Sequence, residues 1–213
     1  MPAKDERSSY NLEVAYALAC ERLASIDIEQ QCRHSGSEYQ RRGSQQVITV
    51  RYLNQPYLIT LPEVEISLGG SAEPVPMRDK ILILHYLTQA KGTPVTGRLI
   101  TFRDLPGGNI YYPTFAKRTI RPLTDHFGQE PALLLANGEK LGGHRADYGD
   151  TAITINAFSR VPITLVLWHG DDELPPQLNL LLDSSIPDYL ETEDVTVLCE
   201  TLTWRLIRSS RAG

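Results

Sequence analysis

One apolar segment near the C-terminus most constrains the fold that this chain can adopt. Residues 161–168 read VPITLVLW, and an apolar run of this length is typical of a strand that is buried on both faces. The neighbouring segments TAITINAF and LNLLLD are also strand-like, and a helix is predicted from about Thr192 to Arg208. The last third of the chain therefore predicts a sheet centred on residues 161–168 and followed by a helix.

The first part of the chain predicts two helices and a hairpin. Apolar residues recur at helical spacing over about residues 12–25 and 77–91. The second of these segments contains the run Ile81 to Leu84, so we expect that helix to be largely buried. Strands are predicted at residues 47–53 and 57–62, joined by a turn around Asn54 to Pro56.

The middle of the chain predicts shorter helices that are delimited by proline and glycine. Pro113 fits the first turn of a helix, Pro122 is expected to kink or divide that helix, and Pro131 opens another. Strands and helices do not alternate strictly. We therefore expect an α+β fold with a mainly antiparallel or mixed sheet and several covering helices, in a single domain over residues 11–213 after a flexible tail at residues 1–10.

Composition excludes several classes of protein. The 213 residues carry a formal net charge of −5 with scattered basic residues, so we expect no nucleic-acid binding. The longest apolar run is too short to span a bilayer, so no membrane insertion is expected. The N-terminal residues are too polar for a signal peptide, and the three cysteines are widely spaced and odd in number. Together these features predict a cytoplasmic protein with reduced thiols.

Three adjacent acids after the central strand form the first candidate site. Asp171, Asp172 and Glu173 stand between two strand-like segments, with His169 before them and Asp183 at the end of the second segment. Glycine, aspartate and two prolines favour a hydrated turn. A divalent-metal site and acid–base catalysis are the alternatives, because clustered carboxylates suit a hard cation and an imidazole admits a transition metal.

Two further segments supply candidates for a binding pocket. Gly107 and Gly108 precede a helix, where backbone N–H groups can meet an anion, and Tyr111 and Tyr112 can line a pocket for a flat ligand. His144 and Asp150 lie in a glycine-rich loop and form the third candidate. Each segment is also explained by ordinary turn and helix-cap chemistry.

Known catalytic and cofactor motifs are missing from the sequence. There is no nucleotide fingerprint, no zinc spacing and no credible serine or cysteine nucleophile beside a base. Three isolated cysteines cannot supply an ordinary iron–sulfur cluster, so we expect none in this chain. The identity of any cofactor stays open.

Several motifs in order resemble those of a domain-of-unknown-function family. They are RDKILILHYL, GTPVTGRLITFRDLPGGNIYYPTF, KLGGHRADYGD and VPITLVLWHGDDELPPQLNLLLDSSIPDYLETEDVTVL. The resemblance covers about residues 11–208. It implies a family found largely in anaerobic bacteria and archaea, some members of which carry an appended iron–sulfur domain that this sequence lacks. It implies no particular reaction.

Two functional hypotheses follow from the residues and the resemblance. The first is a non-catalytic binding or accessory module in anaerobic redox or corrinoid-type metabolism, meeting a small ligand or an iron–sulfur or corrinoid protein near residues 103–115 and 168–183. The second is a metal-assisted, hydrolase-like enzyme that uses the carboxylates of residues 169–183. A shift in melting temperature on metal addition would favour the second hypothesis.

Overall fold

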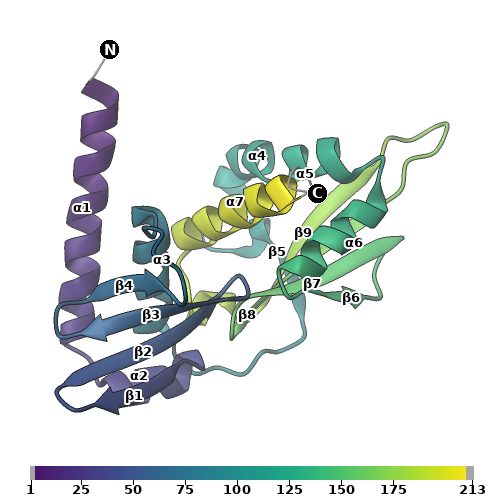
Figure 1. The fold of residues 1–213 in the computed structure, drawn as a ribbon. Coiled ribbons are helices and arrows are strands. Elements are labelled where there is room, and N and C mark those ends of the chain that lie inside the picture. Colours follow the sequence, from purple (N-terminus) through teal and green to yellow (C-terminus); the bar gives the residue numbers. More distant parts are fainter. Residues whose placement is uncertain (1–2, 210–213) are drawn as a thin grey trace. The chain divides into compact units, whose positions relative to one another are not determined.

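The chain folds into helices and antiparallel strands, which confirms the α+β class. The structure, a computed structural model, describes residues 3–209. Contacts group the described residues into two compact units (Figure 1). Unit 1 runs to Thr93 and also includes Asp188–Leu190, and unit 2 contains Pro94–Pro187 and the chain from Glu191 onward. The expected single domain over residues 11–213 stays a prediction. The expected flexibility of residues 1–10 also stays a prediction, and residues 1 and 2 lie outside the described part.

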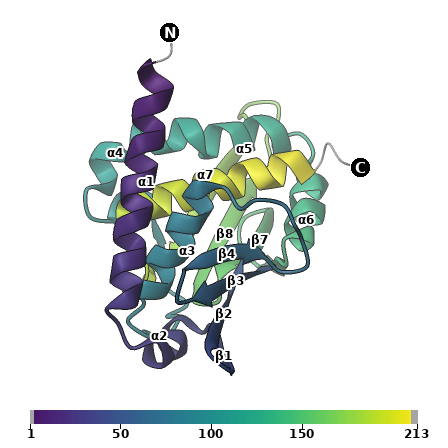
Figure 2. The same ribbon diagram turned by 60° about the vertical axis from the view of Figure 1, so that its left-hand side comes forward.

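Unit 1 is a four-stranded antiparallel sheet with helices. Its elements are α1 (Ala3–Ala24), α2 (Ile28–Ser35), β1 (Glu38–Arg42), β2 (Gln45–Tyr52), β3 (Gln55–Leu61), β4 (Glu65–Leu68) and α3 (Met77–Gln89). The strands pair in the order β1-β2-β3-β4. Ile48, Val50 and Tyr52 are fully buried, so alternate residues of β2 face the core. Figure 2 shows α1 and α3 side by side.

The predicted hairpin is confirmed, but its turn lies one residue earlier than expected. Leu53 and Asn54 both have positive φ, 46° and 62°, and form a two-residue connection between Tyr52 and Gln55. Such turns match the twist of antiparallel strands. Pro56 lies inside β3 opposite Arg51. The side chain of Leu53 is fully buried, and that burial favours leucine at a position where asparagine or glycine is the usual residue.

The predicted buried helix is α3, and its C-terminal end is tied to a distant segment. α3 ends at Gln89, two residues before the end that the helical spacing predicts. Beyond it, Lys91 forms an ion pair of 2.9 Å with Asp188, and Thr93 donates a hydrogen bond of 2.8 Å to the same carboxylate. The ring of Tyr189 stacks on Tyr86, with centroids 5.9 Å apart. These contacts explain why three residues from near the C-terminus belong to unit 1.

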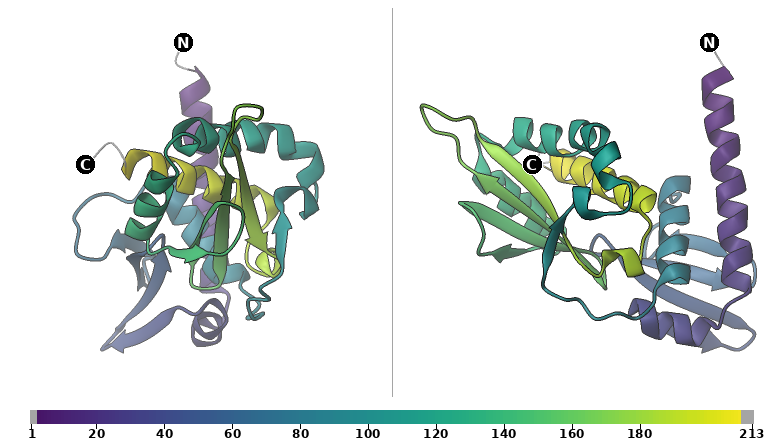
Figure 3. Two further views of the ribbon diagram at one scale, coloured as in Figure 1. Left: turned by 90° about the vertical axis from the view of Figure 1, so that its right-hand side faces the viewer. Right: turned by 180° about the vertical axis from the view of Figure 1, so that it is seen from behind.

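Unit 2 contains the sheet that was predicted from the last third of the chain. Its strands are β5 (Leu99–Thr101), β6 (His144–Ala146), β7 (Thr151–Phe158), β8 (Val161–Trp168) and β9 (Gln177–Asp183). They pair antiparallel in the order β6-β7-β8-β9-β5 (Figure 3). Residues 163–167 of β8 are each at most 3% exposed. The prediction of a central strand buried on both faces is therefore confirmed.

The helices of unit 2 pack on these strands and on one another. They are α4 (Gly108–Arg118), α5 (Ile120–Phe127), α6 (Pro131–Lys140) and α7 (Thr192–Ser209), with short 3₁₀ turns η1 (Phe102–Asp104) and η2 (Ile186–Asp188), the latter ending at the first residue of the 188–190 segment. α5 packs on β9, α6 packs on β7, and α7 packs on α4, α5 and α6. Among the described residues, no helix has the length and apolar character needed to cross a bilayer.

Two details of these helices differ from the predictions. Pro113 lies in the middle of α4 rather than in its first turn, because the helix already begins at Gly108. The division expected at Pro122 occurs at Thr119, whose dihedral angles leave the helical region and whose hydroxyl donates to the carbonyl of Phe115. Pro122 then occupies the first turn of α5, where its missing N–H has no partner to lose. The result is two short helices joined at one residue.

Candidate functional site

The acidic loop between β8 and β9 forms the predicted hydrated turn. One carboxylate oxygen of Asp171 accepts hydrogen bonds from the backbone N–H groups of Glu173, at 2.9 Å, and Leu174, at 2.7 Å. These bonds lower the pKa of Asp171, and the bond from Leu174 has the largest effect. Asp172 and Glu173 are exposed. The aspartate-based turn is thus confirmed, and it engages one carboxylate of the three.

Asp183 lies far from this loop. β8 and β9 pair as expected, but the antiparallel register places Trp168 opposite Gln177 and Ile163 opposite Leu182. Asp183 therefore stands at the other end of β9, roughly 20 Å away along the strand. It is 2% exposed and accepts hydrogen bonds from Thr96, Gly97 and Ser185. Pairing of the two segments separates the acids instead of gathering them.

His169 and Asp150 are brought together at the ends of β7 and β8. The backbone N–H of His169 donates to the Asp150 carboxylate at 2.8 Å, and its ring Nε2 lies 3.0 Å from the Thr151 hydroxyl. The carboxylate holds the backbone rather than the imidazole ring, so it does not orient the ring as in a catalytic triad. His144 is exposed at the start of β6, opposite Thr154. The contacts of His169 with Asp150 and Thr151 therefore join the ends of two paired strands.

Gly107 is explained by its backbone conformation and Gly108 by packing. Gly107 has φ of +70°, which favours glycine. A Cβ at Gly108 would lie 2.0 Å from the carbonyl oxygen of Phe102, so only glycine fits where α4 crosses η1. The rings of Phe102 and Phe115 stack with centroids 3.9 Å apart and hold this crossing together.

The two predicted pocket tyrosines lie on different sides of α4. The guanidinium of Arg103 stacks on the ring of Tyr112 at 3.6 Å and donates to Asn109 at 3.1 Å. Tyr111 is 43% exposed, and the neighbouring Ile110 is 89% exposed. The ring of Tyr112 is therefore used in packing, whereas Tyr111 and Ile110 are exposed apolar side chains of α4.

No metal-binding group is formed by the described residues. Among the described side chains, no three His, Cys, Asp or Glu lie close enough together to hold a metal ion. Asp171 is engaged by the backbone of its own turn. Asp183 is saturated by hydrogen-bond donors at the far end of β9. The donors proposed for a site at residues 169–183 are thus dispersed.

Addition of Mg²⁺, Mn²⁺, Ca²⁺, Zn²⁺ or Fe²⁺ is expected to leave the melting temperature unchanged, because these carboxylates do not converge. A metal at a hundredfold excess over its Kd would stabilise the protein by about 2.7 kcal/mol, which corresponds to a shift of about 5–10 °C for a chain of this size. Differential scanning fluorimetry measures the shift. If the melting temperature rose by that amount in the wild type and not in the variant Asp172→Asn/Glu173→Gln, the result would support the hypothesis of a metal-assisted enzyme.

A groove between α4, α5 and α7 is the surface that sequence reasoning missed. Its volume is about 650 Å³, within the size range of ligand sites. We call it the α7 groove. It is lined by Pro113, Thr114, Lys117, Arg118, Pro122, Glu200 and Trp204.

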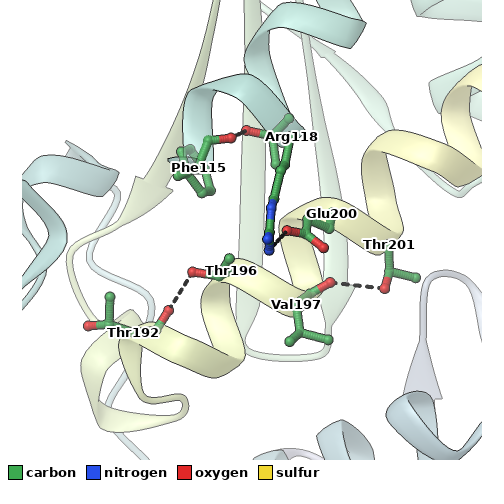
Figure 4. A network of polar contacts seen from close by, with 8 residues as sticks. Phe115, Arg118, Thr192, Thr196, Val197, Glu200 and Thr201 are labelled. Carbon is green, nitrogen blue, oxygen red and sulfur yellow. Dashed lines mark hydrogen bonds and ion pairs between the residues drawn. The ribbon is translucent and has the colours of Figure 1, made fainter. Parts of the chain in front are cut away.

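One ion pair links α4 and α7 in the α7 groove. Arg118 Nη1 lies 2.9 Å from Glu200 Oε1 (Figure 4). The hydrogen bond to Glu200 raises the pKa of Arg118, so the guanidinium stays charged. The hydroxyls of Thr196 and Thr201 donate to carbonyls of their own helix, those of Thr192 and Val197. The two threonine hydroxyls are therefore bonded within α7, and the Arg118–Glu200 pair links α7 to α4.

Trp204 is the apolar feature of the α7 groove. It is 46% exposed and lies one turn after Glu200, outside the buried stripe of α7. The sequence signal was the position of Trp204 on the polar face of an amphipathic helix. Helical spacing predicts the buried face of α7 and gives no information on which exposed side chains bind a partner.

The comparisons with known proteins give a family and no activity. Residues 27–205 match the sequence model of a family described as a domain of unknown function. No curated protein and no solved structure matches the chain.

Proposed function

The chain belongs to the DUF3786 family, a domain of unknown function, and from its geometry we propose that it is a non-catalytic binding module whose α7 groove docks a partner protein. The observation that carries this proposal is the half-exposed Trp204 beside the Arg118–Glu200 ion pair. Tryptophan and arginine are the residues that most often dominate binding energy at protein interfaces.

The physical argument for docking is the solvation of Trp204. An indole that stays nearly half-exposed keeps a large apolar area in water, and its burial against a partner is favourable. Ile110 and Tyr111 are two further exposed apolar side chains of α4, the helix that also supplies Lys117 and Arg118. An apolar centre with a charged rim is the usual composition of a protein interface.

The state of the titratable groups supports a role without covalent chemistry. Burial raises the pKa of the Cys199 thiol, and burial also raises that of Cys32 to about 11. Both groups are therefore thiols at neutral pH, and the thiol is the less nucleophilic form. The imidazole of His169 approaches the Thr151 hydroxyl on an exposed strand end, with no carboxylate bound to its ring among the described contacts. Such a pair lacks the third group that orients a general base.

The proposal extends to the biological setting through the family resemblance. We propose an accessory role in the cytoplasm, in anaerobic redox or corrinoid-type metabolism, with a partner that carries an iron–sulfur cluster or a corrinoid. The three cysteines are free thiols, which suits a reducing compartment. The alternative, metal-assisted hydrolysis at residues 169–183, depends on the metal titration described above.

Trp204→Ala is expected to lower the affinity for the partner about 30-fold, a loss of about 2 kcal/mol that is typical of a hot-spot residue. Tagged protein is used to capture partners anaerobically from the native host, and quantitative mass spectrometry compares wild type with the variant. The captured partner is then assayed for iron, labile sulfide and cobalt.

Trp168→Ala is the matched control, since Trp168 is 39% exposed and lies outside the α7 groove. The same partner is expected with this control as with the wild type. Equal recovery with Trp204→Ala, or loss with Trp168→Ala alone, would contradict docking at the α7 groove.

A further inference from the structure

We infer that the partner element that occupies the α7 groove is an acidic segment, with aspartate or glutamate beside an apolar side chain that packs on Trp204. This inference rests on the proposed function and adds the chemistry of the partner. Two observations support it: the positive charges near Trp204, and the low side-chain entropy of the apolar residues that line the α7 groove.

The first step is the balance of charge in the α7 groove. Its acidic member, Glu200, has a side chain that is 19% exposed and is bound at 2.9 Å by Arg118, so its charge is neutralised locally. Lys117 forms no ion pair with any residue that the structure describes. The charge that the α7 groove offers to a partner is therefore positive.

A second cation lies beyond Trp204 on the same face of α7. Arg208 is exposed and follows Trp204 by one helical turn, and its Nε donates to the carbonyl of Trp204 at 3.1 Å. Glu200, Trp204 and Arg208 thus form one ridge of α7 at a spacing of four residues. Lys117 lines the α7 groove from α4, and Arg208 lies on α7 one turn beyond Trp204.

This positive rim contrasts with the charge of the whole chain. The protein carries a net charge of −5, so an acidic partner is repelled by the surface in general and attracted at this groove. Such an arrangement selects orientation, because complementary charge steers encounter and opposes other modes of docking. A nucleic acid would need a denser array of cations than these residues provide.

The apolar surface is rigid before the partner binds. Pro113 and Pro122 line the α7 groove beside Trp204. Proline has almost no side-chain entropy to lose, and the indole has two rotatable bonds. Little ordering is therefore required when an apolar side chain of the partner enters, which favours binding.

A random peptide display library tests the chemistry of the partner directly. Peptides are selected on the full-length wild-type protein and counter-selected on Trp204→Ala, so that the retained peptides depend on the α7 groove. The retained pool is expected to be enriched in aspartate and glutamate together with leucine, phenylalanine or similar side chains. Lys117→Glu is expected to weaken binding of the synthesised peptides by about tenfold, and rising salt concentration to weaken it further.

Arg145→Glu is the matched control for the charge reversal. Arg145 is an exposed residue of β6 with a side chain 72% exposed, outside the α7 groove, and its ion pair with Glu139 is 3.5 Å long. Peptide affinity is expected to be unchanged in this variant. Circular dichroism and melting temperature show that each variant is folded.

The outcomes separate the two proposals. The inference of an acidic partner segment would be wrong if the Trp204-dependent peptides were not enriched in acidic residues, or if Lys117→Glu did not change their affinity. Docking at the α7 groove would remain supported in both cases. A library that yields no Trp204-dependent peptide would count against both. Displacement of the peptides by single-stranded polyuridine, with direct RNA binding that requires Trp204, would overturn the inference in favour of a nucleic-acid partner.

Discussion

Replacement of Asp183 by alanine is expected to lower the free energy of unfolding by about 3–5 kcal/mol, because it leaves several buried donors without an acceptor. The carboxylate is 2% exposed. It accepts from the backbone and hydroxyl of Thr96, from the backbone of Gly97, and from the backbone and hydroxyl of Ser185, at 2.7–3.1 Å. These bonds fasten residues 96–97 to the end of β9. Urea unfolding with linear extrapolation measures the loss.

Asp183→Asn is expected to be milder, because its side-chain oxygen can keep four of the five bonds. One oxygen of Asp183 accepts from Thr96 and Ser185, and the other accepts from Gly97 alone. The amide nitrogen of asparagine would face that one N–H group, at a cost of about 1–2 kcal/mol. A loss below about 1 kcal/mol for the alanine variant, or a larger loss for asparagine than for alanine, would show that this cluster does not hold the loop.

The free energy of unfolding of the wild type and of Asp183→Asn is expected to depend differently on pH. Burial alone would raise the pKa of Asp183, but the hydrogen bonds from Ser185 and Thr96 outweigh it and hold the pKa below its ordinary value. A lowered pKa in the folded state gives stability that is complete above the pKa of the unfolded chain, about 3.9, and is lost as pH falls through the folded value. Below about pH 4, wild type should therefore lose stability more steeply than Asp183→Asn, as measured by urea unfolding at each pH.

Gly108→Ala is expected to destabilise the protein by about 3 kcal/mol, the upper range for a forced steric overlap. The added methyl group would lie 2.0 Å from the Phe102 carbonyl oxygen and 3.3 Å from the Cβ of Leu105. Backbone atoms cannot rotate aside, so α4 must move away from η1 and disturb the stacked rings of Phe102 and Phe115. Urea unfolding compares this variant with wild type.

Gly107→Ala is the matched control for this substitution. A Cβ at Gly107 meets nothing within 4 Å, and only its φ of +70° opposes alanine. The left-handed conformation costs about 1–2 kcal/mol for a residue with a Cβ. A greater loss at Gly107 than at Gly108 would mean that backbone conformation, rather than the crossing of α4 and η1, requires the glycine pair.

The elements of the fold were predictable where one physical signal dominated. β8 is predictable because it is apolar almost throughout, and α3 because Ile81 to Leu84 leave little polar face. Boundaries were less accurate where packing outweighs local preference. Leu53 adopts a left-handed turn because its side chain is buried, and Pro113 is tolerated inside α4. Neither position follows from the propensity of the residue alone.

The candidate site was less predictable than the fold, because it depends on contacts between distant segments. Arg118 and Glu200 are 82 residues apart in sequence and meet only once α4 and α7 pack together. The acids at residues 171–173 are adjacent in sequence, yet only Asp171 is bound within the turn, and Asp172 and Glu173 are exposed. Trp204 has a local signal, a large apolar residue on the polar face of a helix.

The short return of the chain to unit 1 has a consequence for its synthesis. Tyr189 stacks on Tyr86 and its hydroxyl donates to the Thr93 carbonyl, while Asp188 binds Lys91. These partners lie about a hundred residues apart in sequence, so the rest of unit 1 is synthesised before the residues 188–190 that complete its packing. Unit 1 cannot reach its final packing until nearly all of the rest has been translated. The two halves are therefore expected to become stable together, late in synthesis, and not in the usual order from the N-terminus.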